Sequence, residues 1–119
     1  MPRTISDDEL TKIRTQHPGA RVLSVVPEDA PDGTAGDDYV FKTGTKGDFL
    51  RYKGLQRQSM LGGSGAGQEA TLYARGLCVW PSPEAFDELR EGFPAIAEEL
   101  GQTLLEKARG GLEVREGKR

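Results

Sequence analysis

The chain has 119 residues, of which 35% are hydrophobic, enough for one core but not for two separate domains. Its formal net charge of -3 at pH 7 argues against a general nucleic-acid binder, because duplex binding normally requires a basic domain. The single cysteine, Cys78, excludes an internal disulfide, and the sequence shows neither a leader pattern nor a long apolar run that predicts a membrane segment. We therefore expect one domain over residues 1–110, a flexible tail over 111–119, and a cytoplasmic protein.

The N-terminal segment has the pattern of a short helix followed by a strand. Ser6 is the predicted N-cap, Glu9 follows three residues later as in a capping box, and acidic residues occupy the first turn. Pro18 and Gly19 end the helix, and the β-branched residues of 21–26 predict a strand.

A second strand is predicted at residues 39–43, after a connection over residues 27–38 that is rich in Pro, Gly and Asp. This composition favours a long, mobile connection between two antiparallel strands. Because an isolated hairpin is marginally stable, a helix must cover it.

Four helical patterns follow the second strand. The first runs over residues 46–61 with Thr45 as N-cap, and the second over residues 68–80, so residues 78–80 are expected to be helical and to end at Pro81.

The third helical pattern has the clearest boundary signals, with Ser82 as N-cap, Pro83 at the first position and Gly92 at the C-terminal cap. The fourth begins at Pro94, buries a stripe of Ile96, Leu100 and Leu104, and stops at Gly110. The sequence therefore predicts an α+β fold: an N-terminal helix and a two-stranded antiparallel hairpin, followed by a small bundle of about four helices.

A glycine-rich stretch matches a nucleotide-binding fingerprint, since residues 65–70 read G-A-G-Q-E-A. That fingerprint requires a strand before the glycines and a βαβ unit around them, whereas the preceding residues read as the end of a helix. We favour a hinge. The alternative from another functional class is a small nucleotide-binding enzyme that uses the Gly63–Gly67 loop.

Other candidate residues have simple structural explanations. His17, the only histidine, ends the first helix and has no partner at metal-ligand spacing. Cys78 lies among apolar residues without an adjacent base, which is typical of a small core residue. Trp80 is either a core anchor at a helical corner or an interface hot spot. The sequence predicts no catalytic, metal or cofactor site.

Charge is segregated along the chain. Residues 42–57 contain five basic residues and one acid, whereas residues 81–106 contain seven acids and one arginine. The segregation indicates either two faces of one fold that attract each other, surfaces for different partners, or ordinary solvated helix faces. The predicted partner-binding residues are Lys46, Arg51, Lys53, Arg57 and Trp80.

Three motifs resemble a known family. They are "VFKTGTKGDFLRY" at residues 40–52, the apolar corner "CVWP" at residues 78–81 followed by Phe86, Asp87 and Leu89, and a helix opened by Pro94 with Ile96. Together they resemble the small tail assembly chaperones and related accessory proteins of tailed phages and phage-derived tail clusters. The resemblance covers about residues 6 to 106, and the glycine-rich loop departs from it by replacing a charged helical turn.

The resemblance implies a non-enzymatic protein that binds tail components, such as the tail tube or tape-measure subunit, during assembly in the bacterial host cytoplasm. A structural subunit retained in the finished particle is the alternative within the same biology. No specific functional residue carries over, because the matching positions are structural. The resemblance implies protein partners. No membrane partner is predicted, and the acidic net charge weakens the further alternative of a nucleic-acid binder that uses the basic helix.

Overall fold

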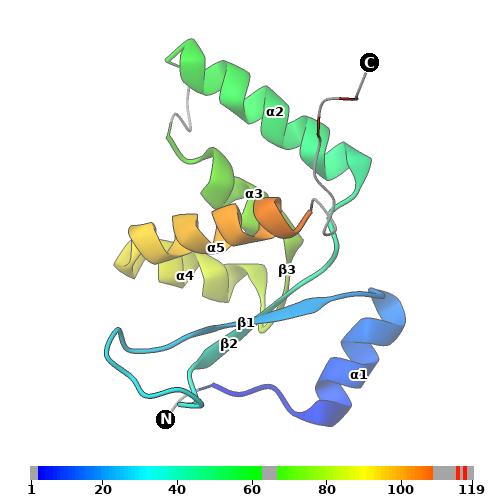
Figure 1. The fold of residues 1–119 in the computed structure, drawn as a ribbon, viewed down its shortest axis with the longest axis vertical. Helices are drawn as coiled ribbons and strands as arrows, with labels where there is room; N and C mark the ends of the chain where they lie inside the picture. Colours follow the sequence, from blue (N-terminus) through cyan, green and yellow to red (C-terminus); the bar gives the residue numbers. More distant parts are fainter. Residues whose placement is uncertain (1–2, 63–66, 109–114, 116, 118–119) are drawn as a thin grey trace.

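The computed structural model describes residues 3–62, 67–108, 115 and 117. Within those residues the fold is α+β, as predicted, with a three-stranded antiparallel sheet and five helices (Figure 1). In chain order the elements are α1 (Asp7–Gln16), β1 (Arg21–Val25), β2 (Asp37–Phe41), α2 (Lys46–Met60), α3 (Glu69–Leu77), β3 (Cys78–Trp80), α4 (Pro83–Gly92) and α5 (Pro94–Lys107).

The predicted antiparallel pairing of the first two strands is confirmed, but the sheet has a third strand, β3, in place of the predicted two-stranded hairpin. β1 and β2 pair antiparallel with Leu23 opposite Tyr39, and β1 is an outer strand in the order β1-β2-β3. The connection between them, predicted to be mobile, contains two hydrogen-bonded turns: the Ala30 N–H donates to the Pro27 carbonyl at 3.0 Å, and the Thr34 N–H donates to the Pro31 carbonyl at 3.2 Å.

The prediction of helix through Trp80 is wrong. α3 ends at Leu77, and residues 78–80 form β3, which pairs antiparallel with β2 so that Trp80 lies opposite Val40. Two local features favour the strand: Val79 is β-branched, and Pro81 biases the preceding residue toward an extended backbone. The deciding contact is with β2, about forty residues earlier in the chain, and helical periodicity gives no information about it.

The sheet separates two hydrophobic clusters because successive side chains of β2 point to opposite faces. Tyr39 and Phe41 belong to the larger cluster with residues of α3, α4 and α5, and the Phe41 and Phe86 rings meet edge to face at 6.1 Å. Val40 belongs to the smaller cluster, where Ile13 of α1 packs on the other side. Figure 1 shows the same layers, with α1 below the strands and α3, α4 and α5 above them.

The helices above the sheet do not form the predicted four-helix bundle. α3, α4 and α5 contribute buried residues to the core, whereas α2 contributes none and extends past the others, packed on α3 (Figure 1). Within α5, Leu100 and Leu104 are buried as predicted, but Ile96 is only half-buried, because the buried face of the helix runs through Ala97 and Gly101.

The predicted helix starts are confirmed by their caps. The hydroxyl oxygens of Ser6 and Ser82 accept hydrogen bonds from the backbone N–H groups of Glu9 and Ala85. The predicted cap at Gly92 is wrong by one position, because Gly92 is the last residue of α4 and Phe93 is the C-cap residue. The predicted stop at Gly110 lies outside the described residues, as does the predicted tail apart from residues 115 and 117.

A buried carboxylate ties the N-terminal segment to the hairpin. Asp38 is 8% exposed, and its carboxylate accepts hydrogen bonds from the backbone N–H of Ile5, at 3.0 Å, and from the hydroxyl of Ser24. The Asp38 backbone N–H donates to the carbonyl of Arg3 at 2.7 Å. The sequence pattern missed this role because Asp38 follows a run of turn residues.

Candidate interaction surface

α2 carries four of the five predicted partner-binding residues and is fixed at its start. The Thr45 hydroxyl accepts from the Asp48 N–H at 3.2 Å, and the Asp48 carboxylate accepts from the Thr45 N–H at 2.8 Å, which completes a capping box. The helix packs on α3, where the Tyr52 ring meets Tyr73 edge to face, with centroids 5.7 Å apart.

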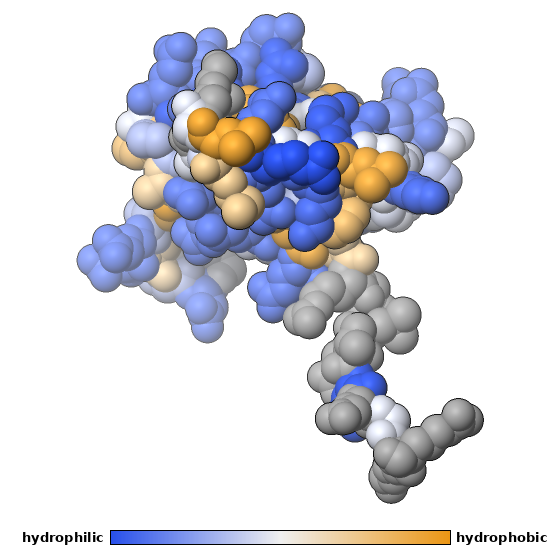
Figure 2. Space-filling model, turned by 90° about the horizontal axis from the view of Figure 1, so that it is seen from above, coloured by the Kyte–Doolittle hydropathy of each residue, from blue (hydrophilic) through white to orange (hydrophobic). Residues whose placement is uncertain are grey.

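The rest of α2 leaves apolar side chains in solvent. Met60 is 88% exposed and Leu61, directly after the helix, is 82% exposed; Leu50 and Phe49 are also exposed, at 57% and 44%. Figure 2 views the molecule from the α2 end and shows hydrophobic patches set among hydrophilic side chains. A surface of this mixed kind is typical of protein interfaces, in which apolar contacts lie within a polar rim.

The four basic side chains of α2 are all exposed but are not equivalent. Arg51 forms an ion pair with Asp48 at 3.1 Å, one turn back along the helix. The Lys53 ammonium lies over the Phe49 ring at 5.5 Å from its centroid. Lys46 and Arg57 form no ion pair within the part of the chain that the structure describes. Those two are therefore the cations most available to a partner.

The electrostatic balance at the start of α2 favours an ionised Asp48. Burial raises the pKa of this carboxyl, but hydrogen bonds from the Thr45 backbone and hydroxyl, together with the positive charge of Arg51, outweigh burial and hold the pKa below its usual value. The charged carboxylate also interacts favourably with the N-terminal end of the helix dipole.

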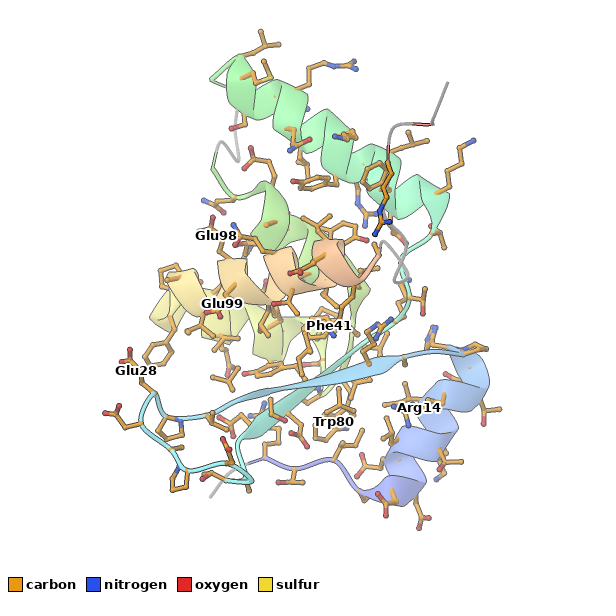
Figure 3. The ribbon with its side chains drawn as sticks, in the orientation of Figure 1. Arg14, Glu28, Phe41, Trp80, Glu98 and Glu99 are labelled. Carbon is orange, nitrogen blue, oxygen red and sulfur yellow. The ribbon has the colours of Figure 1, made fainter. Side chains whose placement is uncertain are left out.

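The structure does not bring Trp80 to α2. Its indole N–H donates to the Glu9 carboxylate of α1 at 3.0 Å, and its ring packs on the smaller cluster around Val40. In Figure 3 Trp80 lies on the α1 side of the sheet, whereas α2 lies at the opposite end of the molecule. Trp80 is therefore a partly buried link between α1 and β3, and it is not part of the α2 surface.

An ion-pair cluster that sequence reasoning missed joins α3 to the acidic helix α4. Arg75 of α3 donates two hydrogen bonds to Asp87 of α4, at 3.3 and 3.2 Å, and Arg90 lies 3.2 Å from the same carboxylate. The hydrogen bond from Arg75 is the main reason that the pKa of Asp87 is lowered. Because Arg75 and Asp87 are twelve residues apart on different helices, spacing along one helix could not reveal the pair.

The glycine-rich stretch joins two helices. α2 ends at Met60 and α3 begins at Glu69, so no strand precedes the glycines as the nucleotide fingerprint requires. Residues 63–66, and with them most of the predicted Gly63–Gly67 loop, lie outside the described residues. The last glycine, Gly67, has a left-handed backbone and donates its N–H to the Ser59 hydroxyl at 3.2 Å. The hinge interpretation stays a prediction.

The remaining candidates from the sequence lie in structural positions. Cys78 is buried, and burial is the main reason that its pKa is raised to about 11. The His17 backbone N–H caps α1 by donating to the Ile13 carbonyl at 2.7 Å. Over the described ranges, no three His, Cys, Asp or Glu side chains gather as metal ligands would. Nor does any helix there combine the length and apolar content needed to cross a bilayer.

Comparison with known proteins identifies no relative: no family model matches the chain, and searches of curated proteins and of solved structures give no match.

Proposed function

We propose that this protein is a non-enzymatic interaction protein of the phage-tail assembly type that its sequence resembles, and that it binds a tail tube or tape-measure component through α2. The observation that supports the proposal is the exposure of α2. This helix of 15 residues packs on α3, with the Tyr52 ring against Tyr73, but fully buries none of its own residues. Tertiary packing normally stabilises such a helix, so its exposed face suits a partner.

The chemistry of that face defines the partner. The only acid of the helix, Asp48, is already paired with Arg51. Three further basic residues of the helix have no acid to balance them within it: Lys46, Lys53 and Arg57. A fitting partner therefore carries acidic side chains around an apolar surface that receives residues such as Leu50 and Met60. Opposite charges would speed and orient the encounter, while burial of the apolar side chains would supply most of the affinity.

A pull-down tests the proposal. Tagged protein is recovered from a lysate of host cells that produce the tail proteins, and mass spectrometry identifies what is bound. The double variant Lys46→Glu, Arg57→Glu should lose the tail component, and the loss should be greatest at low salt. These positions are preferable to Arg51, because reversing Arg51 would also break its ion pair with Asp48.

Lys12→Glu is the matched control, since Lys12 is exposed on α1 at the far end of the molecule. Equal recovery of the tail component by all three proteins would exclude α2 as the binding surface. Recovery without any tube or tape-measure component would contradict the tail assignment. Detection of the chain in purified particles would assign it to the permanent structure.

A further inference from the structure

β1 presents an open edge of the sheet. The strand pairs with β2 on one side only, and no other described segment hydrogen-bonds to its outer side. In Figure 1 β1 crosses in front of β2, and no helix is drawn over it. Its five residues contain no proline, and their only charge is Arg21 at one end. Apart from the charge of Arg21, the strand therefore lacks the proline and covering helix that commonly protect an edge from pairing with another strand.

An apolar hollow follows this edge. It lies between β1 and α5, has a volume of about 290 Å³, and is lined mainly by Leu23, Val25, Val26, Ile96 and Leu100. Ile96, which the sequence predicts to be in the core, lines this hollow and is half-buried. Val26 is 44% exposed beside it.

The two ends of the edge carry opposite charge. At the Arg21 end, a second hollow is lined by Arg14, Arg21 and Lys107 and, among the described residues, by no acid. At the Val25 end, Glu99 lines the apolar hollow, and Glu28 follows the strand. Figure 3 shows this separation, with Arg14 beyond one end of β1 and Glu28 and Glu99 toward the other.

We infer that β1 pairs antiparallel with β1 of a second copy of this chain, which gives a two-fold symmetric dimer with one continuous sheet. A two-fold axis through the Leu23 pair places Arg21 of each copy opposite Val25 of the other. Glu99 lines the same hollow as Val25, so the basic end of each copy meets the acidic end of its neighbour. The charges are then complementary at both ends of the contact.

The same symmetry covers the apolar hollow. The two-fold axis of an antiparallel strand pair is perpendicular to the sheet, so both copies of α5 lie on the same face. The two hollows then meet, and Ile96 and Val26 of each copy pack over the joined strands. Cross-strand apolar contacts of this kind add to the backbone hydrogen bonds.

Sedimentation equilibrium of the full chain, with two charge reversals, tests the dimer. Arg21→Glu places an acid at the basic end of the edge, and Glu99→Lys places a base at the acidic end. In a dimer of either variant, position 21 of each copy then faces a like charge at position 99 of the other, so each variant alone should dimerise at least about tenfold more weakly. An equimolar mixture of the two should form a heterodimer. In it the two reversed charges face each other at one end of the contact, and the two unchanged charges face each other at the other end. Glu98→Lys is the control: Glu98 precedes Glu99 on α5, but it does not line the hollow.

Hydrogen exchange locates the contact independently of these variants. The backbone amides of Arg21–Val25 that point away from β2 should exchange more slowly as protein concentration rises through the dimerisation range, while those of α2 should be unaffected. A monomer at every concentration would overturn the inference, and so would a dimer whose concentration-dependent protection lies in α2. The test is separate from that of the proposed function, because the α2 surface and the β1 edge share no residue.

Discussion

Gly101 of α5 lies directly against the backbone carbonyl of Ala70 in α3, with no room for a Cβ atom between the two helices. Gly101 is buried, and α3 and α5 both contribute to the larger core. The close approach of these two helices therefore depends on the absence of a side chain at position 101. Backbone cannot move aside as a flexible side chain can.

The first prediction follows from this contact. Gly101→Ala should lower the free energy of unfolding by about 1–3 kcal/mol or more, because the added methyl group overpacks the α3–α5 contact. Gly54→Ala is the matched control, since Gly54 is exposed on α2 and a Cβ atom there meets nothing within 4 Å. This control should be neutral or stabilise by up to about 1 kcal/mol through helix propensity. Urea denaturation measures both, and equal stabilities would contradict the packing argument.

Features that depend on residues close together in the sequence were predicted correctly, whereas features that depend on contacts between distant segments were missed. Ser6, Thr45 and Ser82 cap their helices as predicted, because a cap depends on residues two or three positions away. β3 was missed because its pairing with β2 joins distant segments, and Asp38 was missed because its partner Ile5 is 33 residues away.

The candidate site shows the same division. The exposure of the basic residues on α2 follows from their pattern along one helix, and the Arg51–Asp48 pair is at a spacing that sequence can indicate. The separation of Trp80 from α2 depends on which face of the sheet each element covers. No local pattern fixes that placement.

The second prediction concerns the buried carboxylate of Asp38. Asp38→Ala should lower the free energy of unfolding by about 1–3 kcal/mol, because the Ile5 N–H and the Ser24 hydroxyl lose their buried acceptor. Asp37→Ala is the control: Asp37 accepts one exposed hydrogen bond, from the Arg3 N–H at 2.8 Å, and its loss should cost no more than about 0.5 kcal/mol. A larger effect at Asp37 than at Asp38 in urea denaturation would refute this account.

The third prediction is a pH dependence that arises at Asp48. The pKa of this carboxyl is lowered in the folded chain, so its contribution to stability is complete above the ordinary value of 3.8 and is lost as pH falls through the lower folded value. The stability difference between the wild type and Asp48→Asn should therefore be constant near neutral pH and shrink at acid pH. Urea denaturation over a pH series measures the difference, and a constant gap throughout would exclude the linkage.

The fourth prediction uses the reactivity of the Cys78 thiol to measure how often the folded core opens. Burial is the main reason that its pKa rises from 9.0 to about 11, so at neutral pH the folded chain holds about a hundredfold less thiolate than the unfolded chain. Cys78 as a whole is also only 4% exposed. A colorimetric disulfide reagent should therefore react slowly with the native protein and rapidly in urea.

If opening of the core controls the reaction of Cys78 with the reagent, the reaction rate should rise in Gly101→Ala and remain at the wild-type value in Gly54→Ala. The two variants differ in core packing, while Cys78 and its immediate neighbours are the same in both. Rapid modification of the native wild type would instead show that the β2–β3 contact opens independently of the core. Equal, slow rates in all three proteins would mean that the α3–α5 contact does not limit access to the thiol.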